Sequence, residues 1–161
     1  MTINYTTSYR RPFDCSEEKL LSIITEPGNL QNFHPFCQEN IPIKWPGDGA
    51  VDELKYLNGR VFTRKITRWH EYGYDLTITH RNIKTNVEWN IIVDKDKPML
   101  EITLSPLFLP HNSIYRFFSF FFYVKPQLTR YLKAIFNGLD FYISTGQQVS
   151  PNQFGRHAWF S

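Results

Sequence analysis

The sequence predicts an α+β fold in which a curved antiparallel sheet wraps around a long C-terminal helix, with two short helices after the first strand. One observation is the segment from Pro126 to about Thr145, whose apolar residues recur at three- and four-residue steps and share one helix face. The other is a run of turn-punctuated strands with no helix between them, which indicates an antiparallel meander with one apolar face. A long helix across a curved sheet tends to enclose a cavity, so ligand binding is the leading functional hypothesis.

The composition indicates one domain with a large apolar core. The chain has 161 residues, of which 42% are hydrophobic, 17% aromatic and 20% charged, so extensive apolar surface has to be buried. A net charge of +3, with basic and acidic residues evenly mixed, argues against a nucleic-acid partner. Cys15 and Cys37 form no disulfide framework and no apolar signal segment follows Met1, so we expect a cytoplasmic protein.

The N-terminal part combines one strand with two helices. Residues 5–10 alternate in polarity as a strand does. Asp14 or Ser16 can then cap a helix whose apolar side extends up to Pro27, and residues 29–33 form a second short helix.

From Gln38 onward strands dominate, and glycine, asparagine and aspartate mark the turns between them. Asn58-Gly59 predicts a hairpin with a two-residue loop. The later strands span about residues 60–70, 74–80, 87–93 and 99–105. The meander is therefore unbroken as far as the last strand.

Alternation along the strands identifies the inward-facing positions. They form three sets: Tyr74, Leu76, Ile78 and His80; Val87, Trp89, Ile91 and Val93; and Leu100, Ile102 and Leu104. Glu88 and Asn90 point outward. In the strand over 60–70, Phe62 and Ile66 share a face with charged residues, so the pattern leaves open which face lies inside.

Two aromatic segments flank the long helix. Residues 106–125 contain a tyrosine and phenylalanine run that is too short, and too closely bounded by prolines, to cross a membrane. We expect an extra helix packed over the sheet opening; the alternative is a surface that contacts a membrane or another protein. Phe154, Trp159 and Phe160 in the tail predict docking on the same domain or, alternatively, insertion into a partner subunit.

A strand, two short helices, a six-strand meander and a long C-terminal helix follow one another in the order of the helix-grip fold. The segment from Ile24 to Pro35 is similar to the one that follows the first helix in that fold, where an aromatic residue commonly precedes a proline. Over about residues 3–146 the chain resembles the START and birch-pollen-allergen superfamily, also called SRPBCC. It looks closest to the polyketide cyclase/dehydrase-like group.

This resemblance implies an internal hydrophobic cavity for a lipid, a polyketide, a quinone or another apolar molecule. The family also contains cyclases, aromatases and dehydratases. The chain departs from simpler members through the aromatic insert at about 106–125 and the tail at 147–161, which extends beyond the helix-grip domain of residues 1–146. Either segment can plug the cavity.

Candidate chemistry is sparse. His34 and Cys37 have the spacing of two metal ligands, but one pair alone does not make a site, and we expect no metal or cofactor. His80 is either a core histidine held by one hydrogen bond or a group that orients a ligand or acts as an acid or base. Arg64 and Arg68 are expected to extend to solvent or to bind a ligand carboxylate.

The leading hypothesis is therefore binding or transport of a small hydrophobic ligand. We expect the cavity to be lined by Tyr74, Leu76, Ile78, His80, Val87, Trp89, Ile91, Leu104, Leu132, Phe136 and Leu139. One alternative is a cyclase or dehydratase that uses His80 or a nearby arginine. The other is a module that contacts a protein or a membrane through its insert and tail. The sequence leaves the ligand and the oligomeric state open.

Overall fold

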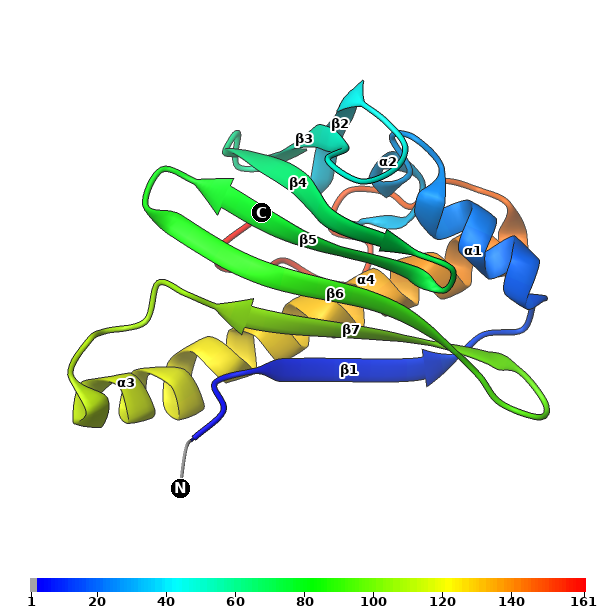
Figure 1. Cartoon of the computed structure of the whole chain (residues 1–161). Helices are drawn as coiled ribbons and strands as arrows, with labels where there is room; N and C mark the ends of the chain where they lie inside the picture. The colour runs from blue at the N-terminus through cyan, green and yellow to red at the C-terminus, as the bar shows by residue number, and fades with distance from the viewer. Residues whose placement is uncertain (1–2) are drawn as a thin grey trace.

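A computed structural model describes residues 3–161. Its seven-stranded antiparallel sheet has the order β1-β7-β6-β5-β4-β3-β2 and curls around the C-terminal helix (Figure 1). The strands are β1 (Thr7–Pro12), β2 (Cys37–Lys44), β3 (Val51–Tyr56), β4 (Val61–His70), β5 (Gly73–His80), β6 (Ile83–Val93) and β7 (Pro98–Pro106). The predicted fold class and the unbroken meander are confirmed, and β1 pairs with β7 at one edge of the sheet.

Two short helices follow β1, as predicted. The helices are α1 (Glu17–Thr25), α2 (Leu30–Phe33), α3 (Ser113–Ser119) and α4 (Lys125–Thr145), with one π-helical turn, η1 (Phe120–Val124), between the last two. Ser16 caps α1, because its side chain accepts a hydrogen bond from the Lys19 N–H. The buried amide of Asn29 donates to the Ile24 carbonyl at 2.6 Å and so fixes the connection between α1 and α2.

Helix α4 fills the concave side of the sheet with the apolar face that the periodicity predicted. Its buried residues include Leu128, Leu132, Ile135, Phe136 and Leu139. Gly138 allows the backbones of α4 and α2 to touch, since a Cβ atom at this position would lie 1.9 Å from the Phe33 carbonyl oxygen.

The β3–β4 hairpin differs from the predicted two-residue loop. The Tyr56 N–H donates to the Arg60 carbonyl and the Gly59 N–H donates to the Tyr56 carbonyl, so three residues, 57–59, form the loop. Gly59 has φ +83°, the left-handed conformation that such three-residue loops require. The longer loop moves the register by one residue and places Asp52 opposite Arg64.

The inward positions of the strands were predicted well. Buried residues on the concave face are Tyr74, Leu76, Val87, Trp89, Ile91, Leu100, Ile102 and Leu104, whereas Ile78 and His80 are half-buried. The prediction that Val93 faces inward was wrong, because this residue lies at the end of β6 beside the hairpin loop and is 58% exposed. Glu88 and Asn90 are exposed, as expected.

The aromatic insert is helical, but it does not pack over the sheet opening. Helix α3 and the η1 turn continue into α4, and because α4 is aligned along the sheet, α3 projects past the ends of β1 and β7 (Figure 1). None of the seven residues of α3 is buried. The π-helical turn comes immediately before Pro126, whose ring does not fit inside a regular α-helix. No helix within residues 3–161 is long and apolar enough to cross a membrane.

The C-terminal tail folds back over the domain, which confirms docking on its own chain. The Val149 N–H donates to the Asn32 carbonyl and the Asn152 N–H to the Pro35 carbonyl, so the tail first follows the segment after α1. Farther on, Phe160 is 9% exposed and packs against the concave side of the sheet.

Candidate functional site

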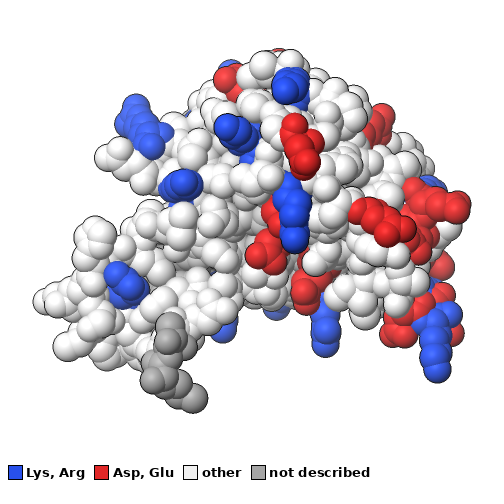
Figure 2. Space-filling model, in the orientation of Figure 1, with Lys and Arg blue, Asp and Glu red and all other residues white. Residues whose placement is uncertain are grey.

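An apolar pocket of about 210 Å³ lies between the concave sheet, the start of α4 and the tail. It is lined by Tyr56, Arg60, Phe62, Ile78, Ile83, Thr85, Leu104, Phe108, Leu128, Tyr131, Trp159 and Phe160. Figure 2 shows the surface hollowed at this end of the molecule, between the lobe that carries α3 and the β5–β6 turn. The pocket lies between the sheet and the helix, where a cavity was predicted, but it occupies only one end of the interior.

The tail forms one wall of this pocket. The ring of Phe160 stacks on Tyr56 with 4.3 Å between centroids and lies 4.9 Å from Tyr131. Asn58 Nδ2 donates to the Trp159 carbonyl at 2.6 Å, and His157 Nε2 donates to the Gln127 carbonyl at 2.9 Å. The last residues of the chain therefore reduce the volume left for a ligand, as the resemblance allowed.

Three buried polar side chains are linked by hydrogen bonds and form a chain that leads from the end of α2 to the pocket. The Tyr131 hydroxyl lies 2.9 Å from His34 Nε2 and 2.8 Å from the Tyr56 hydroxyl. The Phe36 N–H donates to His34 Nδ1, so the histidine proton is on Nε2 and is donated to Tyr131. Burial, followed by the nearby charge of Arg64, lowers the pKa of His34 to about 3, so the ring is neutral at physiological pH.

This chain contains one more donor proton than it uses. His34 supplies one N–H, and the two tyrosines supply two O–H groups, but only two hydrogen bonds join the three side chains. Whichever tyrosine donates to the other, one hydroxyl proton has no acceptor within residues 3–161. Both tyrosines line the pocket, and burial raises the pKa of Tyr131 to about 12. The unpaired hydroxyl proton therefore belongs to one of two uncharged side chains that line the pocket, of which Tyr131 also lines a small interior cavity.

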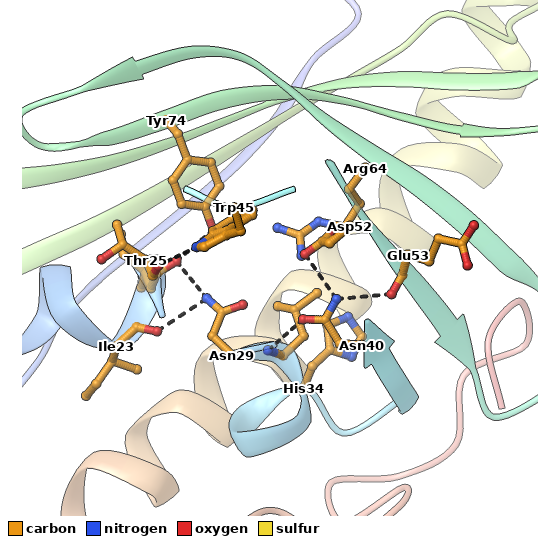
Figure 3. A network of polar contacts seen from close by, with 12 residues as sticks. Ile23, Thr25, Asn29, His34, Asn40, Trp45, Asp52, Glu53, Arg64 and Tyr74 are labelled. Atoms are coloured by element: carbon orange, nitrogen blue, oxygen red, sulfur yellow. Dashed lines mark hydrogen bonds and ion pairs between the residues drawn. The ribbon is translucent and has the colours of Figure 1, made fainter. Parts of the chain in front are cut away.

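Arg64, Asp52 and Asn40 form a second buried polar cluster, on β4, β3 and β2 (Figure 3). Arg64 Nη1 donates to Asp52 Oδ2 at 2.9 Å, and Asn40 Nδ2 donates to the same oxygen at 3.0 Å. The Asn40 amide also donates to the Glu53 carbonyl and accepts a hydrogen bond from the Leu30 N–H. The exposed fraction of Arg64 is only 2%, so the expectation that this side chain extends to solvent was wrong.

Arg64 is held in its charged form. Burial alone would lower the pKa of Arg64, but the carboxylate of Asp52 and the surrounding tyrosine oxygens raise it overall. Arg64 Nη2 has no acceptor within residues 3–161, and Arg64 and His34 both line a small interior cavity of about 20 Å³. A cavity of this size has room for about one water molecule.

The predicted lining residues other than His80 fall into three groups. Ile78 and Leu104 line both the pocket and the interior cavity. Val87, Trp89 and Leu132 line the interior cavity alone. The others pack in the core away from both, namely Tyr74, Leu76, Ile91, Phe136 and Leu139.

His80, the weak catalytic candidate, lines neither the pocket nor the interior cavity as the described residues form them. Its Nδ1 lies 2.6 Å from the Val61 carbonyl oxygen, and its ring stacks on Phe62. This is the arrangement of a histidine held by one hydrogen bond. Arg68 is exposed and pairs with Asp75 at 2.8 Å.

The sequence analysis missed the two pocket tyrosines. Tyr131 lies three residues after Leu128, on the helix face whose periodicity was recognised, and Tyr56 lies beside a recognised turn. Neither position carries a motif, so the only available signal was a tyrosine among apolar core residues.

The His34 and Cys37 pair does not have the arrangement of two metal ligands. His34 Nε2 is hydrogen-bonded to the Tyr131 hydroxyl and His34 Nδ1 accepts from the Phe36 N–H, so neither ring nitrogen is free to bind a metal. No group of three or more His, Cys, Asp or Glu side chains in residues 3–161 has the arrangement of a metal site.

No protein-family model and no curated protein matches this chain. Three solved structures illustrate its structural neighbours. DynU16, from the dynemicin biosynthetic locus, shares 12% identity and a TM-score of 0.71 over 91% of this chain, which spans about half (49%) of the DynU16 chain. A START superfamily protein from Mycobacterium smegmatis shares 15% identity and a TM-score of 0.69, with coverage of 88% of this chain and 99% of that one. Ara h 8.0201 shares 14% identity and a TM-score of 0.62, with 87% and 97% coverage. The chain thus has the same fold as these proteins, the helix-grip fold that its sequence predicted.

Proposed function

We propose that this protein binds a small, largely apolar molecule with a hydrogen-bond acceptor, such as a ketone, in the pocket beside the tail. The observation that carries the proposal is the unused hydroxyl proton of the Tyr56 and Tyr131 pair, because both side chains line a pocket whose other lining residues are apolar except for Arg60, Thr85 and the indole N–H of Trp159. Ligand sites in proteins combine apolar walls with a few placed polar groups in this way.

The pocket volume limits the ligand. About 210 Å³ is below the roughly 300–1,000 Å³ of typical small-molecule sites. With the tail in place, the pocket suits one small ring system or a short acyl segment. A polyketide-like molecule of greater length would have to extend out of the open end or displace Phe160.

Binding is favoured over catalysis because the pocket has donors and no base. None of the described residues that line it is Asp, Glu or His. His34 accepts a hydrogen bond through Nδ1 and donates one through Nε2, so it has no free nitrogen to take a proton. A cyclase or dehydratase remains the second candidate, since the tyrosine donor would also stabilise an enolate oxygen.

The first experiment compares two ligands that differ only in the acceptor, 2-acetylnaphthalene and 2-ethylnaphthalene, by quenching of protein fluorescence. One hydrogen bond is worth about 1 kcal/mol, so the ketone should bind about fivefold more tightly. The preference should disappear in the Tyr56→Phe/Tyr131→Phe variant and persist in Tyr9→Phe, because Tyr9 packs against Phe136 away from the pocket. Equal affinities in the wild-type protein would refute the donor role.

A second pair of variants locates the site. Thr85→Trp places a large side chain in the pocket, whereas Thr79→Trp places the same side chain on the outward face of β5. Only the first should abolish binding. Native mass spectrometry of freshly purified protein would identify a co-purifying ligand, and consumption of a bound ketone would favour the enzyme.

A further inference from the structure

Helix α3 and the η1 turn present a large apolar surface that the rest of the described chain leaves mostly uncovered. Its outer residues, which we call the aromatic face, are Ile114, Tyr115, Phe117, Phe118, Phe122 and Tyr123, with exposed fractions from 38% to 73%. Soluble proteins rarely expose a contiguous patch of this kind without a use for it.

Packing and hydrogen bonds on the inner side of α3 and η1 fix the position of the aromatic face. Phe120 is fully buried and makes an edge contact with Tyr5 at 5.3 Å, so the η1 turn is packed on the segment before β1. Arg116 donates to the Pro110 and His111 carbonyls and fixes the loop that precedes α3. On the outer side, Phe118 and Phe122 stack on each other with 5.7 Å between centroids. The rings are therefore presented on an ordered helix.

The charged residues of the insert are basic. Between residues 106 and 125 the sequence contains Arg116 and Lys125 and no acidic residue, and the Lys125 ammonium lies over the Phe121 ring. In the view of Figure 2, the visible coloured and white surface of the lobe that carries α3 has few charged side chains, while most of the visible acidic side chains lie towards the opposite end. A projecting apolar helix bordered by basic residues is complementary to a bilayer with anionic headgroups.

The aromatic face also reaches the mouth of the pocket. The Trp159 Nε1–H donates to the Tyr123 hydroxyl at 3.2 Å, and Trp159 is a pocket wall. Phe108, which precedes α3, lines the same pocket. Tyrosine and tryptophan at such a border are typical of residues that lie at the level of lipid headgroups.

We propose that the aromatic face docks on an anionic lipid bilayer, with Phe118 and Phe122 inserted and the pocket mouth turned towards the membrane. A bilayer fits this surface better than a protein does, because α3 projects as a convex ridge and a bilayer accepts a ridge without a matching groove. The docking does not depend on the proposed ligand, since it uses residues outside the pocket.

The test is co-sedimentation with vesicles of equal parts phosphatidylcholine and phosphatidylglycerol, and with phosphatidylcholine alone. The wild-type protein should bind the mixed vesicles more strongly, and salt should weaken this binding. Phe118→Ser/Phe122→Ser should reduce partitioning at least about tenfold, because two large apolar side chains no longer insert. The matched control is Ile41→Ser/Ile43→Ser, which removes two exposed apolar side chains from β2; its partitioning should be unchanged.

The result that would overturn the proposal is absence of binding to both vesicles, or binding that the Phe118→Ser/Phe122→Ser variant retains. Light scattering of the same samples covers the other occupant of the face. If the wild-type protein is a dimer that does not bind vesicles, and this variant is a monomer, the face binds a second copy of the chain and the proposal is wrong. Ketone binding by the Phe118→Ser/Phe122→Ser variant should remain normal, so failure of docking and failure of the pocket proposal are separable.

Discussion

Two arginines of β4 each pair with an aspartate of a neighbouring strand, and one of these ion pairs is buried while the other is exposed. Arg64 and Asp52 are 2.9 Å apart, with side-chain exposures of 2% and 1%, whereas Arg68 and Asp75 are 2.8 Å apart, with exposures of 68% and 22%. Both pairs join neighbouring strands, so they differ mainly in burial. We predict that Asp52→Asn destabilises the fold far more than Asp75→Asn.

The magnitudes follow from the burial of each partner. Removing the carboxylate of Asp52 leaves the Arg64 charge uncompensated in the core, which costs about 3–5 kcal/mol of unfolding free energy. The exposed pair is screened by solvent and contributes only about 0.2–1 kcal/mol. With a urea m-value of about 2 kcal/mol/M, the unfolding midpoint should fall by about 1.5–2.5 M for Asp52→Asn and by at most about 0.5 M for Asp75→Asn.

The assay is urea unfolding at pH 7, followed by tryptophan fluorescence and by far-UV circular dichroism to check two-state behaviour. The double variant Asp52→Asn/Arg64→Met removes both charges and should recover part of the lost stability. If Asp52→Asn cost no more than Asp75→Asn at an unchanged m-value, the reasoning would fail, because Arg64 would then be stabilised without its carboxylate.

Three further predictions concern the tail, the buried histidine and the contact between α2 and α4. Phe160→Ala should open the pocket and tighten binding of the larger probe N-phenyl-1-naphthylamine, at a cost of at most about 3–5 kcal/mol in urea unfolding; unchanged binding would contradict its role as a wall. The pKa of His34 is about 3 in the folded protein against an ordinary value of 6.5, so the unfolded chain binds the extra proton between these values. Stability should therefore fall as pH decreases through this range, and a His34→Gln variant should show a smaller difference between urea midpoints at pH 4 and pH 7. Gly138→Ala should cost about 1–3 kcal/mol, because the new Cβ would lie 1.9 Å from the Phe33 carbonyl oxygen, whereas Lys133→Ala on the exposed side of α4 should change stability by less than about 0.5 kcal/mol.

The elements and their buried faces were predictable because local signals determine them. The Ser16 cap precedes an apolar helix face, and period-two alternation identified the inward residues of β5, β6 and β7. Such patterns depend on residues close in the chain, so they survive the absence of any tertiary information.

The polar parts of the interior were not predictable in the same way. Arg64 was left between two faces because its partner comes from β3, and a two-residue loop at Asn58-Gly59 would have placed it opposite Glu53 instead of Asp52. The three-residue loop changes the register by one position, and this change brings the guanidinium to a buried carboxylate. Likewise, the link between His34 and Tyr131 joins residues far apart in the chain, and no local pattern indicates it.

The tail connects the two proposed surfaces of the molecule. Phe160 limits the volume of the pocket, and its neighbour Trp159 donates to Tyr123 on the aromatic face. A movement of Tyr123 on a bilayer would therefore act on the same segment that a large ligand must displace. Because linkage between two binding events is reciprocal, a membrane that loosened the tail would strengthen the binding of large ligands, and those ligands would strengthen membrane docking by the same factor. A ligand small enough to leave Phe160 in place would show no such coupling, since it would not displace the tail.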